Sequence, residues 1–290
     1  MKIALITTLA GLEENKRIKK EVQSLGYGFE LVDLKSFGFK VRNQKVSVDG
    51  FNNFKADIAI VRGIFSSIKA ISVLVRSLQK KGIAVFDNNF LKHRYSIDKV
   101  MDLMKMSYAN IPIPDMAYTR DFEKYKSNAK NIGYPVIVKS TRMGKGASVF
   151  KVENEGELNK LVSEIVADGK EAKSYIVQEY IPYKYDLRSL VIGEDVFTMQ
   201  RIPAKGEFRA NFSLGGSVEV FNLDKKGKSL ALRALSSIDM SVGGVDTLIT
   251  KDNKRYILEV NHTAGFVGME KATGVNIGKL YVEHAIKNAK

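Results

Sequence analysis

The stretch YILEVNHTAGFVGMEKATGVNIG, residues 256–278, decides the fold of this chain of 290 residues. Its first half has the residue pattern of a β-strand, whose side chains alternate between the two faces of a sheet. The alternation predicts that Ile257, Glu259 and Asn261 point to the same face. A carboxylate and a carboxamide are therefore expected side by side near the end of this strand.

A second strand is predicted just upstream, at residues 243–249 (GGVDTLI), and the polar residues 251–254 (KDNK) suit a tight turn between the two. A two-residue turn makes the two lysines of KDNK face each other and places Asp246 opposite Glu259. Two carboxylates across a ladder repel each other unless a cation lies between them. Together with Asn261 they form an all-oxygen set of the kind that magnesium prefers, so we infer a magnesium nucleotide site. The alternative is a polar hairpin face that meets only water.

The composition is that of an ordinary globular protein, with 44% hydrophobic and 27% charged residues. The length suffices for two or three compact units. No segment approaches the roughly 20 apolar residues of a membrane span, so we expect no membrane partner. The chain has no cysteine, which excludes disulfides, thiolate zinc sites and a cysteine nucleophile. The start, MKIALITTLAG, has the pattern of a buried strand and not of a signal peptide. The lack of cysteine and the lack of a signal-peptide pattern together favour the cytoplasm.

The charge is strongly basic, with a formal net charge of +14. Residues 1–95 hold 17 basic and 8 acidic residues, and the difference of +9 is most of the excess. An excess of this size attracts polyanions such as nucleotides, acidic peptides or nucleic acid. Solubility alone is the other explanation, because the lysines are scattered along the chain.

Residues 1–95 alternate strand and helix patterns, which predicts βαβ units on a parallel sheet. Strands are expected at 2–8, 29–34, 56–62 and 83–86, helices at 14–25 and 67–80, and a small hairpin at 41–48. The first strand is not followed by Gly-x-Gly-x-x-Gly, so the dinucleotide fingerprint is absent. Residues 111–181 are expected to run strand, helix, strand, loop, strand, helix, strand.

The end of the chain carries a family resemblance. The strand that ends in Glu259-x-Asn261, the glycine loop after it, Ala-Thr-Gly at 272–274 and an amphipathic helix at about 277–287 together resemble the ATP-grasp superfamily, and more narrowly the RimK-type amino-acid (glutamate) ligases. The resemblance implies an α/β fold, α+β in part: an ATP-grasp fold after a Rossmann-like pre-ATP-grasp domain. The expected units are residues 1–95, a central and lid part at 96–182, and a C-terminal part with the metal site at 183–290.

Several further residues match nucleotide-binding positions of the family. A helix is expected at 88–107 with a lysine that contacts the nucleotide, a strand ends in a second lysine, a basic glycine loop covers the phosphates, and the strand QEYI lines the adenine and ribose pocket. An aspartate then accepts from a ribose hydroxyl and an arginine clamps an anion. These residues are Lys99, Lys139, Gly144, Gly146, Gln178, Glu179, Tyr180, Ile181, Asp186 and Arg188. Without the family pattern, a lysine on a solvated helix face is the better explanation for Lys99, glycine loops are common, and an ordinary amphipathic strand is an alternative for Gln178 and Tyr180.

The resemblance also implies the groups that meet the reacting atoms. Arg201, Arg209 and Asn211 match positions that contact phosphates or the bound carboxylate, and Asp246, Glu259 and Asn261 match the metal ligands. The chain differs from RimK-type enzymes at Met143 and Ser148, where those usually have glycine, and at His262 and Ala264, where they have a small residue and proline. His262 adjoins the metal cluster, with either a catalytic role or a packing and substrate-contact role.

The implied activity is carboxylate–amine ligation with ATP and Mg²⁺, or Mn²⁺, as cofactors. ATP converts a carboxylate to an acylphosphate, and an amine displaces the phosphate. Glutamate or another amino acid is then added to a peptide, a protein terminus or a small-molecule carboxylate, and the family resemblance implies a homo-oligomer. Two alternatives stay open: a non-catalytic nucleotide-binding module, and a basic nucleic-acid- or ribosome-associated protein. The chain lacks an aromatic-interleaved basic motif, so we expect nucleic acid only through a ribosomal substrate.

Overall fold

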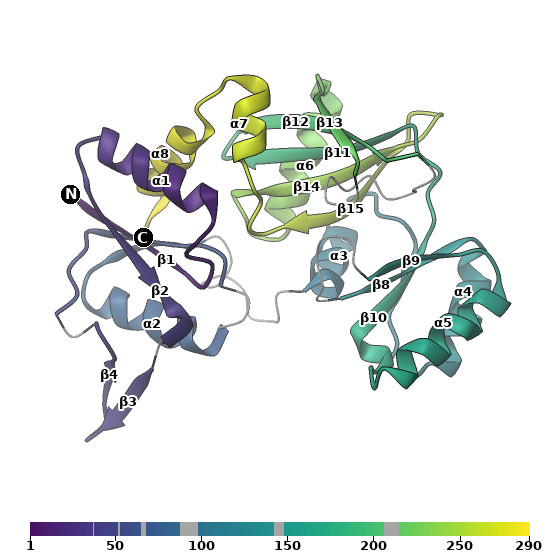
Figure 1. Cartoon of the computed structure of the whole chain (residues 1–290), viewed down its shortest axis with the longest axis horizontal. Coiled ribbons are helices and arrows are strands. Elements are labelled where there is room, and N and C mark those ends of the chain that lie inside the picture. The colour runs from purple at the N-terminus through teal and green to yellow at the C-terminus, as the bar shows by residue number, and fades with distance from the viewer. Residues whose placement is uncertain (37, 52, 65–67, 88–97, 142–147, 206–214) are drawn as a thin grey trace.

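The computed structural model describes residues 1–36, 38–51, 53–64, 68–87, 98–141, 148–205 and 215–290. Three main sheets form the molecule, the first at one end and the other two at the opposite end (Figure 1). They use strands within residues 2–87, 116–179 and 185–261. The predicted boundaries at 95/96 and 182/183 stay predictions. Within the described ranges, no helix is long and apolar enough to cross a membrane.

The first sheet is parallel, as the alternating pattern predicts. Its strands run in the order β2 (Gly28–Asp33), β1 (Lys2–Thr7), β5 (Ile58–Val61) and β6 (Ala84–Asp87). The apolar run of β1 from Ile3 to Ile6 is fully buried, as expected for a central parallel strand covered on both faces. The connecting elements are α1 (Glu13–Ser24), the 3-10 turn η1 (Leu34–Ser36), the predicted hairpin of β3 (Phe39–Arg42) and β4 (Lys45–Val48), and α2 (Ile68–Lys80).

The second sheet is antiparallel and follows the predicted order of elements. Its strands are arranged β7 (Met116–Ala117), β10 (Tyr175–Glu179), β8 (Val136–Ser140) and β9 (Val149–Val152). The helices α4 (Glu123–Ile132) and α5 (Glu155–Ala167), with the 3-10 turn η3 (Ala172–Ser174), complete this unit. Tyr125 of α4 is buried among the apolar side chains of the unit, and its hydroxyl donates to the Ala172 carbonyl at 2.8 Å. The predicted helix at 88–107 is described only as α3 (Lys99–Tyr108).

The third sheet carries the predicted hairpin and is antiparallel throughout. Its strands run β13 (Ser217–Val220), β12 (Asp195–Ile202), β11 (Tyr185–Ile192), β14 (Val242–Ile249) and β15 (Arg255–Asn261). One face packs on α3 and α6 (Lys225–Ser237) through apolar residues such as Ala231, Leu235 and Val245. The opposite face is apolar at one end, where Leu190 and Ile192 join the core of the first sheet, and charged at the other end.

The turn before β15 differs from the prediction. The hydrogen bonds from Asn253 N to Thr250 O (3.0 Å) and from Thr250 N to Lys254 O (3.0 Å) close a wider turn, so the two lysines of KDNK do not face each other. A β-bulge then restores the register, because Thr247 pairs with Ile257 and Asp246 pairs with Glu259. Asp246 therefore lies opposite Glu259 as predicted, although the turn that led to this expectation is wrong.

The bulge also corrects the predicted strand face. Leu258 is the extra residue, so the strict alternation breaks between Ile257 and Glu259. Ile257 is fully buried in the core beside Val260, on the side of α6. The prediction that Ile257 shares a face with the carboxylate was therefore wrong.

The end of the chain returns to the first sheet (Figure 1). The loop predicted after β15 contains a short helix, α7 (Val267–Thr273), which ends at Gly274 with φ of +71°. The predicted final helix is α8 (Ile277–Asn288), and its Ile277, Val282 and Ala285 pack in the same core as β1 and α1. The first sheet and the last helix thus form one hydrophobic unit.

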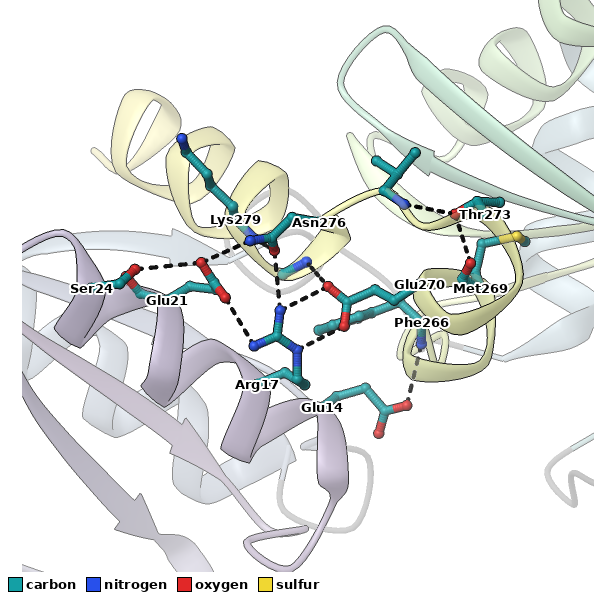
Figure 2. Close-up of polar contacts among 12 residues, drawn as sticks. Glu14, Arg17, Glu21, Ser24, Phe266, Met269, Glu270, Thr273, Asn276 and Lys279 are labelled. Carbon is teal, nitrogen blue, oxygen red and sulfur yellow. Dashed lines mark hydrogen bonds and ion pairs between the residues drawn. The ribbon is translucent and has the colours of Figure 1, made fainter.

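A polar network joins α1 to the segment that links α7 and α8 (Figure 2). The guanidinium of Arg17 donates to both carboxylate oxygens of Glu270 at 2.7 and 3.0 Å, pairs with Glu21 at 2.9 Å, and donates to Asn276 at 3.1 Å. Glu270 in turn accepts from the Gly278 backbone N–H at 2.9 Å, in the first turn of α8. This network fixes the chain that follows β15 against the first helix.

Candidate active site

The charged end of the third sheet is built as a row across three strands. Arg188 of β11 pairs in register with Asp246 of β14, which pairs with Glu259 of β15. The Arg188 guanidinium donates to both oxygens of Asp246, from Nε at 2.8 Å and from Nη2 at 2.7 Å. The repulsion between the Asp246 and Glu259 carboxylates is therefore reduced by the positive guanidinium of Arg188 on the next strand.

A second arginine extends the cluster to β12. Arg201 donates from Nη1 to Asp246 at 2.9 Å and from Nε to Asp186 at 2.8 Å, and all three side chains are about nine-tenths buried or more. Burial alone raises the pKa of Asp246, but the two guanidiniums outweigh it and hold that pKa well below its usual range. Burial raises the pKa of Asp186 to about 6, against the attraction of Arg201. Asp246 is therefore the firmly ionised member of the pair.

Two lysines reach the same face from other elements. Lys99, the first residue of α3, places Nζ 3.4 Å from Glu259 Oε2. Lys139 of β8 is buried, and its Nζ donates to the Leu258 carbonyl at 3.4 Å. Burial lowers the pKa of Lys139 to about 8, which Glu259 opposes and Lys99 reinforces. The bulged residue thus supplies the backbone oxygen that holds the lysine of the second sheet against the third.

The predicted metal ligands share this face, and their surroundings decide what they could hold. Asn261 pairs in register with Gly244, beside the Asp246–Glu259 pair, and its buried Nδ2 has no hydrogen-bond partner in the described part of the chain. That part contains no group of three His, Cys, Asp or Glu side chains suited to a metal ion. With the three carboxylates of Asp186, Asp246 and Glu259 (−3) and the four cations of Lys99, Lys139, Arg188 and Arg201 (+4), the cluster has a formal charge of +1.

A net positive cluster does not favour a bare divalent cation, since the arginines already neutralise Asp246. It does favour a cation that arrives with phosphates, because the phosphates supply both negative charge and most of the oxygen ligands. The residues present therefore fit Mg²⁺ as part of a metal–nucleotide complex.

The strand predicted to line the adenine and ribose pocket is β10. Gln178 is buried, and its Nε2 has no hydrogen-bond partner among the described residues. Glu179 Oε2 accepts from the Asp115 backbone N–H at 3.3 Å, and the Tyr180 ring lies under Lys151 Nζ at 4.3 Å. Ile181 is buried just beyond the strand. Their contact with a nucleotide stays a prediction.

Some predicted residues lie outside the described part of the chain. These are Gly144, Gly146, Arg209 and Asn211, together with Met143. The structure brings together Lys99, Lys139, Asp186, Arg188, Arg201, Asp246 and Glu259, with Asn261 beside them.

Sequence reasoning missed the partner of His262. Its Nε2 lies 2.7 Å from Asp102 Oδ2, and both side chains are buried. Asp102 lies three residues after Lys99 on α3, and residues at this spacing share a helix face. The predicted role of Lys99 could therefore have pointed to Asp102 on the same helix face. The partners of the two side chains, Glu259 and His262, lie at the end of β15 and directly after it.

Comparison with known proteins identifies the family. Residues 96–284 match the family model described as a RimK-like ATP-grasp domain. A probable alpha-L-glutamate ligase 2 of Pseudoalteromonas atlantica is 28% identical over 300 residues, covering 100% of this chain and 97% of that relative. A probable alpha-L-glutamate ligase of a Marinomonas species is 29% identical over 296 residues, covering 100% of this chain and 96% of that relative.

Solved structures share the fold. The ATP-grasp ligase PsnB complexed with its minimal precursor has a TM-score of 0.71 at 18% identity, covering 98% of both chains. PsnB complexed with its minimal precursor, Mg and ADP has a TM-score of 0.69 at 18% identity, covering 98% of this chain and 97% of that chain.

The fold and the charged face define an ATP-grasp enzyme. More narrowly, the chain belongs to the RimK-like ATP-grasp family, and it is an ATP-dependent ligase of the amide-forming kind.

Proposed function

We propose that this ligase adds glutamate to the carboxylate of a peptide, a protein terminus or a small molecule, through an acylphosphate. The observation that carries the proposal is the cluster on the third sheet, where four cations from β8, β11, β12 and α3 surround two paired carboxylates. Bringing an anionic carboxylate to an anionic phosphate is the main electrostatic obstacle in this reaction. A preorganised cationic face lowers that barrier without a covalent protein nucleophile.

The chemistry balances with the groups present. An oxygen of the substrate carboxylate attacks the γ-phosphorus of ATP, and the bond from this phosphorus to the bridging oxygen of ADP breaks. The amine of the second substrate attacks the acyl carbon, the bond to phosphate breaks, and the amine nitrogen loses a proton. The products are the amide, ADP and inorganic phosphate.

Each cation has a proposed place in these steps. Lys99 and Lys139 hold the nucleotide phosphates, and Arg201 faces the acylphosphate oxygens. Arg209, outside the described residues, has the same proposed role by its match to the family. Asp246, Glu259 and Asn261 would hold Mg²⁺, which offsets charge on the transferring phosphoryl group when it is bound. Arg188 and Arg201 keep Asp246 ionised and orient it, because three of their N–H groups donate to its two oxygens.

The choice of glutamate rests on the names of the curated relatives, whose sequences align over the whole chain. The acceptor is left as a carboxylate class, for which PsnB and its precursor peptide provide one example. The lack of cysteine fits a reaction in the reducing cytoplasm.

An ADP-release screen tests the proposal. The protein is incubated with ATP, Mg²⁺, each amino acid and a panel of acceptors with free carboxylates, and product masses are read out. We expect ADP release that needs both substrates and a product heavier by one glutamate residue. ADP release with no amide product, or release that another amino acid supports better than glutamate, would contradict the assignment of substrate.

A further inference from the structure

A buried arginine lies outside the cluster described above. Arg62 follows β5, at the carboxyl end of the parallel sheet, and it is 6% exposed. Among the residues that the structure describes, no carboxylate lies within ion-pair distance of its guanidinium. Arginine keeps its charge in proteins, and a buried charge without a counter-ion is costly. The position therefore calls for an anion that the described chain does not supply.

Two side-chain hydrogen bonds to described residues orient Arg62 without neutralising it. Nη2 donates to the Ala264 carbonyl at 2.8 Å, and Nη1 donates to Asn15 Oδ1 at 3.3 Å. Both acceptors are uncharged, and a guanidinium has five N–H groups. These contacts hold the side chain between α1 and the loop after β15, while other donors stay available to a ligand.

Arg62 lines a pocket between the first and third sheets. The pocket has a volume of ≈ 20 Å³, and its other walls include Gly63, Gly243, His262, Thr263 and Tyr281. A space of this size holds about one water molecule or the end of a small polar group. Gly63 has φ of +67°, a backbone conformation that L side chains rarely adopt, and a Cβ there would lie 3.0 Å from Leu9 Cδ1, so this wall of the pocket favours glycine.

The pocket adjoins the proposed metal ligands. Ala264, which accepts from Arg62, is three residues after Asn261, so their Cα atoms lie at most about 11 Å apart. His262 and Thr263, which wall the pocket, are the residues between them. The pocket and the proposed metal ligands therefore share one short stretch of chain at the end of β15.

We propose that Arg62 binds a carboxylate of the incoming amino acid, and so directs its amine toward the acyl carbon. The inference rests on the proposed function and names a specificity residue for it. A carboxylate matches the planar fork of arginine, and it supplies the missing counter-charge. The small volume favours the end of an amino acid over a peptide chain, whose acceptor carboxylate instead meets the arginines of the third sheet.

The test compares glutamate with its two amides, glutamine and isoglutamine, as the amine substrate. Wild-type enzyme should discriminate against at least one of them, because one amide lacks the carboxylate that Arg62 reads. Arg62→Gln keeps a donor for the Ala264 carbonyl but has no charge, and it should raise KM for glutamate about tenfold or more and lose the discrimination. Arg62→Lys keeps the positive charge and should retain part of the discrimination between glutamate and its amides.

Lys16→Gln is the matched control, because it removes an exposed cation from the same helix and leaves Arg62 and both of its hydrogen-bond acceptors in place. It should keep the wild-type ratio of kcat/KM between glutamate and the amides. ADP binding, measured for every variant, should be unchanged, since Arg62 is outside the proposed nucleotide site. A purely packing role for Arg62 instead predicts equal losses for glutamate and both amides, and that result would overturn the assignment.

A measurement on the wild type alone covers the case in which Arg62→Gln does not fold. Glutarate, which has carboxylates and no amine, should compete with glutamate, whereas glutaramide should not. Equal inhibition by the two compounds, or no discrimination by the wild type against either amide, overturns the role of Arg62. A wild type that consumes no amino acid at all overturns the proposed function instead.

Discussion

Lys139 is the cation of the site whose charge is most easily lost. Burial lowers its pKa to about 8, so the side chain is charged below that pH and increasingly neutral above it. ATP phosphates bind the charged form, and above pH of about 8 binding must take up a proton. We predict that the Kd for ATP rises as pH increases from about 7 to about 9, with a limiting slope of about tenfold per pH unit. Calorimetric titrations with ATP across this range measure the effect.

Lys139→Ala is the control for that titration. The variant should lose the rise in Kd between these pH values, and it should weaken ATP binding more than AMP binding because the proposed partners are the outer phosphates. An equal loss for ATP and AMP would place Lys139 away from those phosphates. A steep pH dependence that survives in the variant would assign the titration to another group.

Single residues also mark what the sequence could and could not predict. Glu259 and Asp246 were found because carboxylates on adjacent strands are conspicuous in a hairpin pattern. Arg62 and Asp102 were not found, because Arg62 meets the Ala264 carbonyl and Asp102 meets His262 across more than 150 residues of chain. Sequence periodicity indicates which residues form the buried face of a helix or strand, but it does not indicate which distant element packs on that face.

At the scale of elements, the hairpin of β14 and β15 shows how a local error can leave a correct register. The turn pattern predicted two residues, whereas the side-chain and backbone bonds of Thr250 stabilise a wider turn. The bulge at Leu258 compensates for the wider turn and restores the predicted register. The alternation of polar and apolar residues does not reveal this bulge, because an apolar side chain fits either face of the strand. The site depends on the bulge, since its carbonyl accepts from Lys139.

The network that joins α1 to α7 and to the start of α8 should contribute to stability. Arg17 and Glu270 are largely buried, with side chains 24% and 12% exposed, and they form two hydrogen bonds. We predict that Arg17→Met and Glu270→Gln each lower Tm, and that a double-mutant cycle gives a favourable coupling of about 1 kcal/mol. Lys16 and Glu13, an exposed pair on the same helix, provide a matched control with a coupling near zero. Additive effects of Arg17 and Glu270 would contradict the role of the network.

The same pair predicts a pH dependence. Burial raises the pKa of Glu270, but the bonds from Arg17 and the Gly278 N–H outweigh it and leave the pKa below its ordinary value of 4.5. A depressed folded-state pKa adds stability above the unfolded value, and this stability is lost as pH falls through the folded value. The wild type should therefore lose more unfolding free energy below pH of about 4.5 than Glu270→Gln does. Parallel denaturation curves from about pH 6 to about pH 3 measure the difference.

At the scale of the molecule, the basic charge of residues 1–95 suggests steering of an acidic acceptor. Lys19 and Lys20 are exposed on α1, whereas Lys81 donates to the Phe51 carbonyl and is less suitable for replacement. We predict that Lys19→Glu with Lys20→Glu lowers kcat/KM for an acidic acceptor and leaves kcat nearly constant. The effect should fade with added salt, because screening limits exposed charges to roughly 8 Å near physiological ionic strength. A difference that persists at high salt would indicate direct contact, and no difference at any salt would leave solubility as the explanation.

The arrangement of the three sheets was only partly accessible from sequence. The parallel first sheet and the order of elements through residues 111–181 were predicted and confirmed, because each rests on local periodicity. The return of α8 to the core of β1 was not predicted, since it depends on contacts between the two ends of the chain. That return brings α1 and the end of β5 beside the loop that follows Asn261.

We propose that Asp246, Glu259 and Asn261 hold magnesium together with ATP for ligation. The most direct measurement is the rate of ADP release against magnesium concentration for the wild type and Glu259→Gln, which removes one charge and keeps the side-chain size. The variant should stay folded, with an unchanged far-UV spectrum and Tm within a few degrees, but its magnesium-dependent turnover should fall by about 100-fold or more at non-saturating magnesium. Wild-type rates from Glu259→Gln at non-saturating magnesium would contradict this assignment of the magnesium ligands.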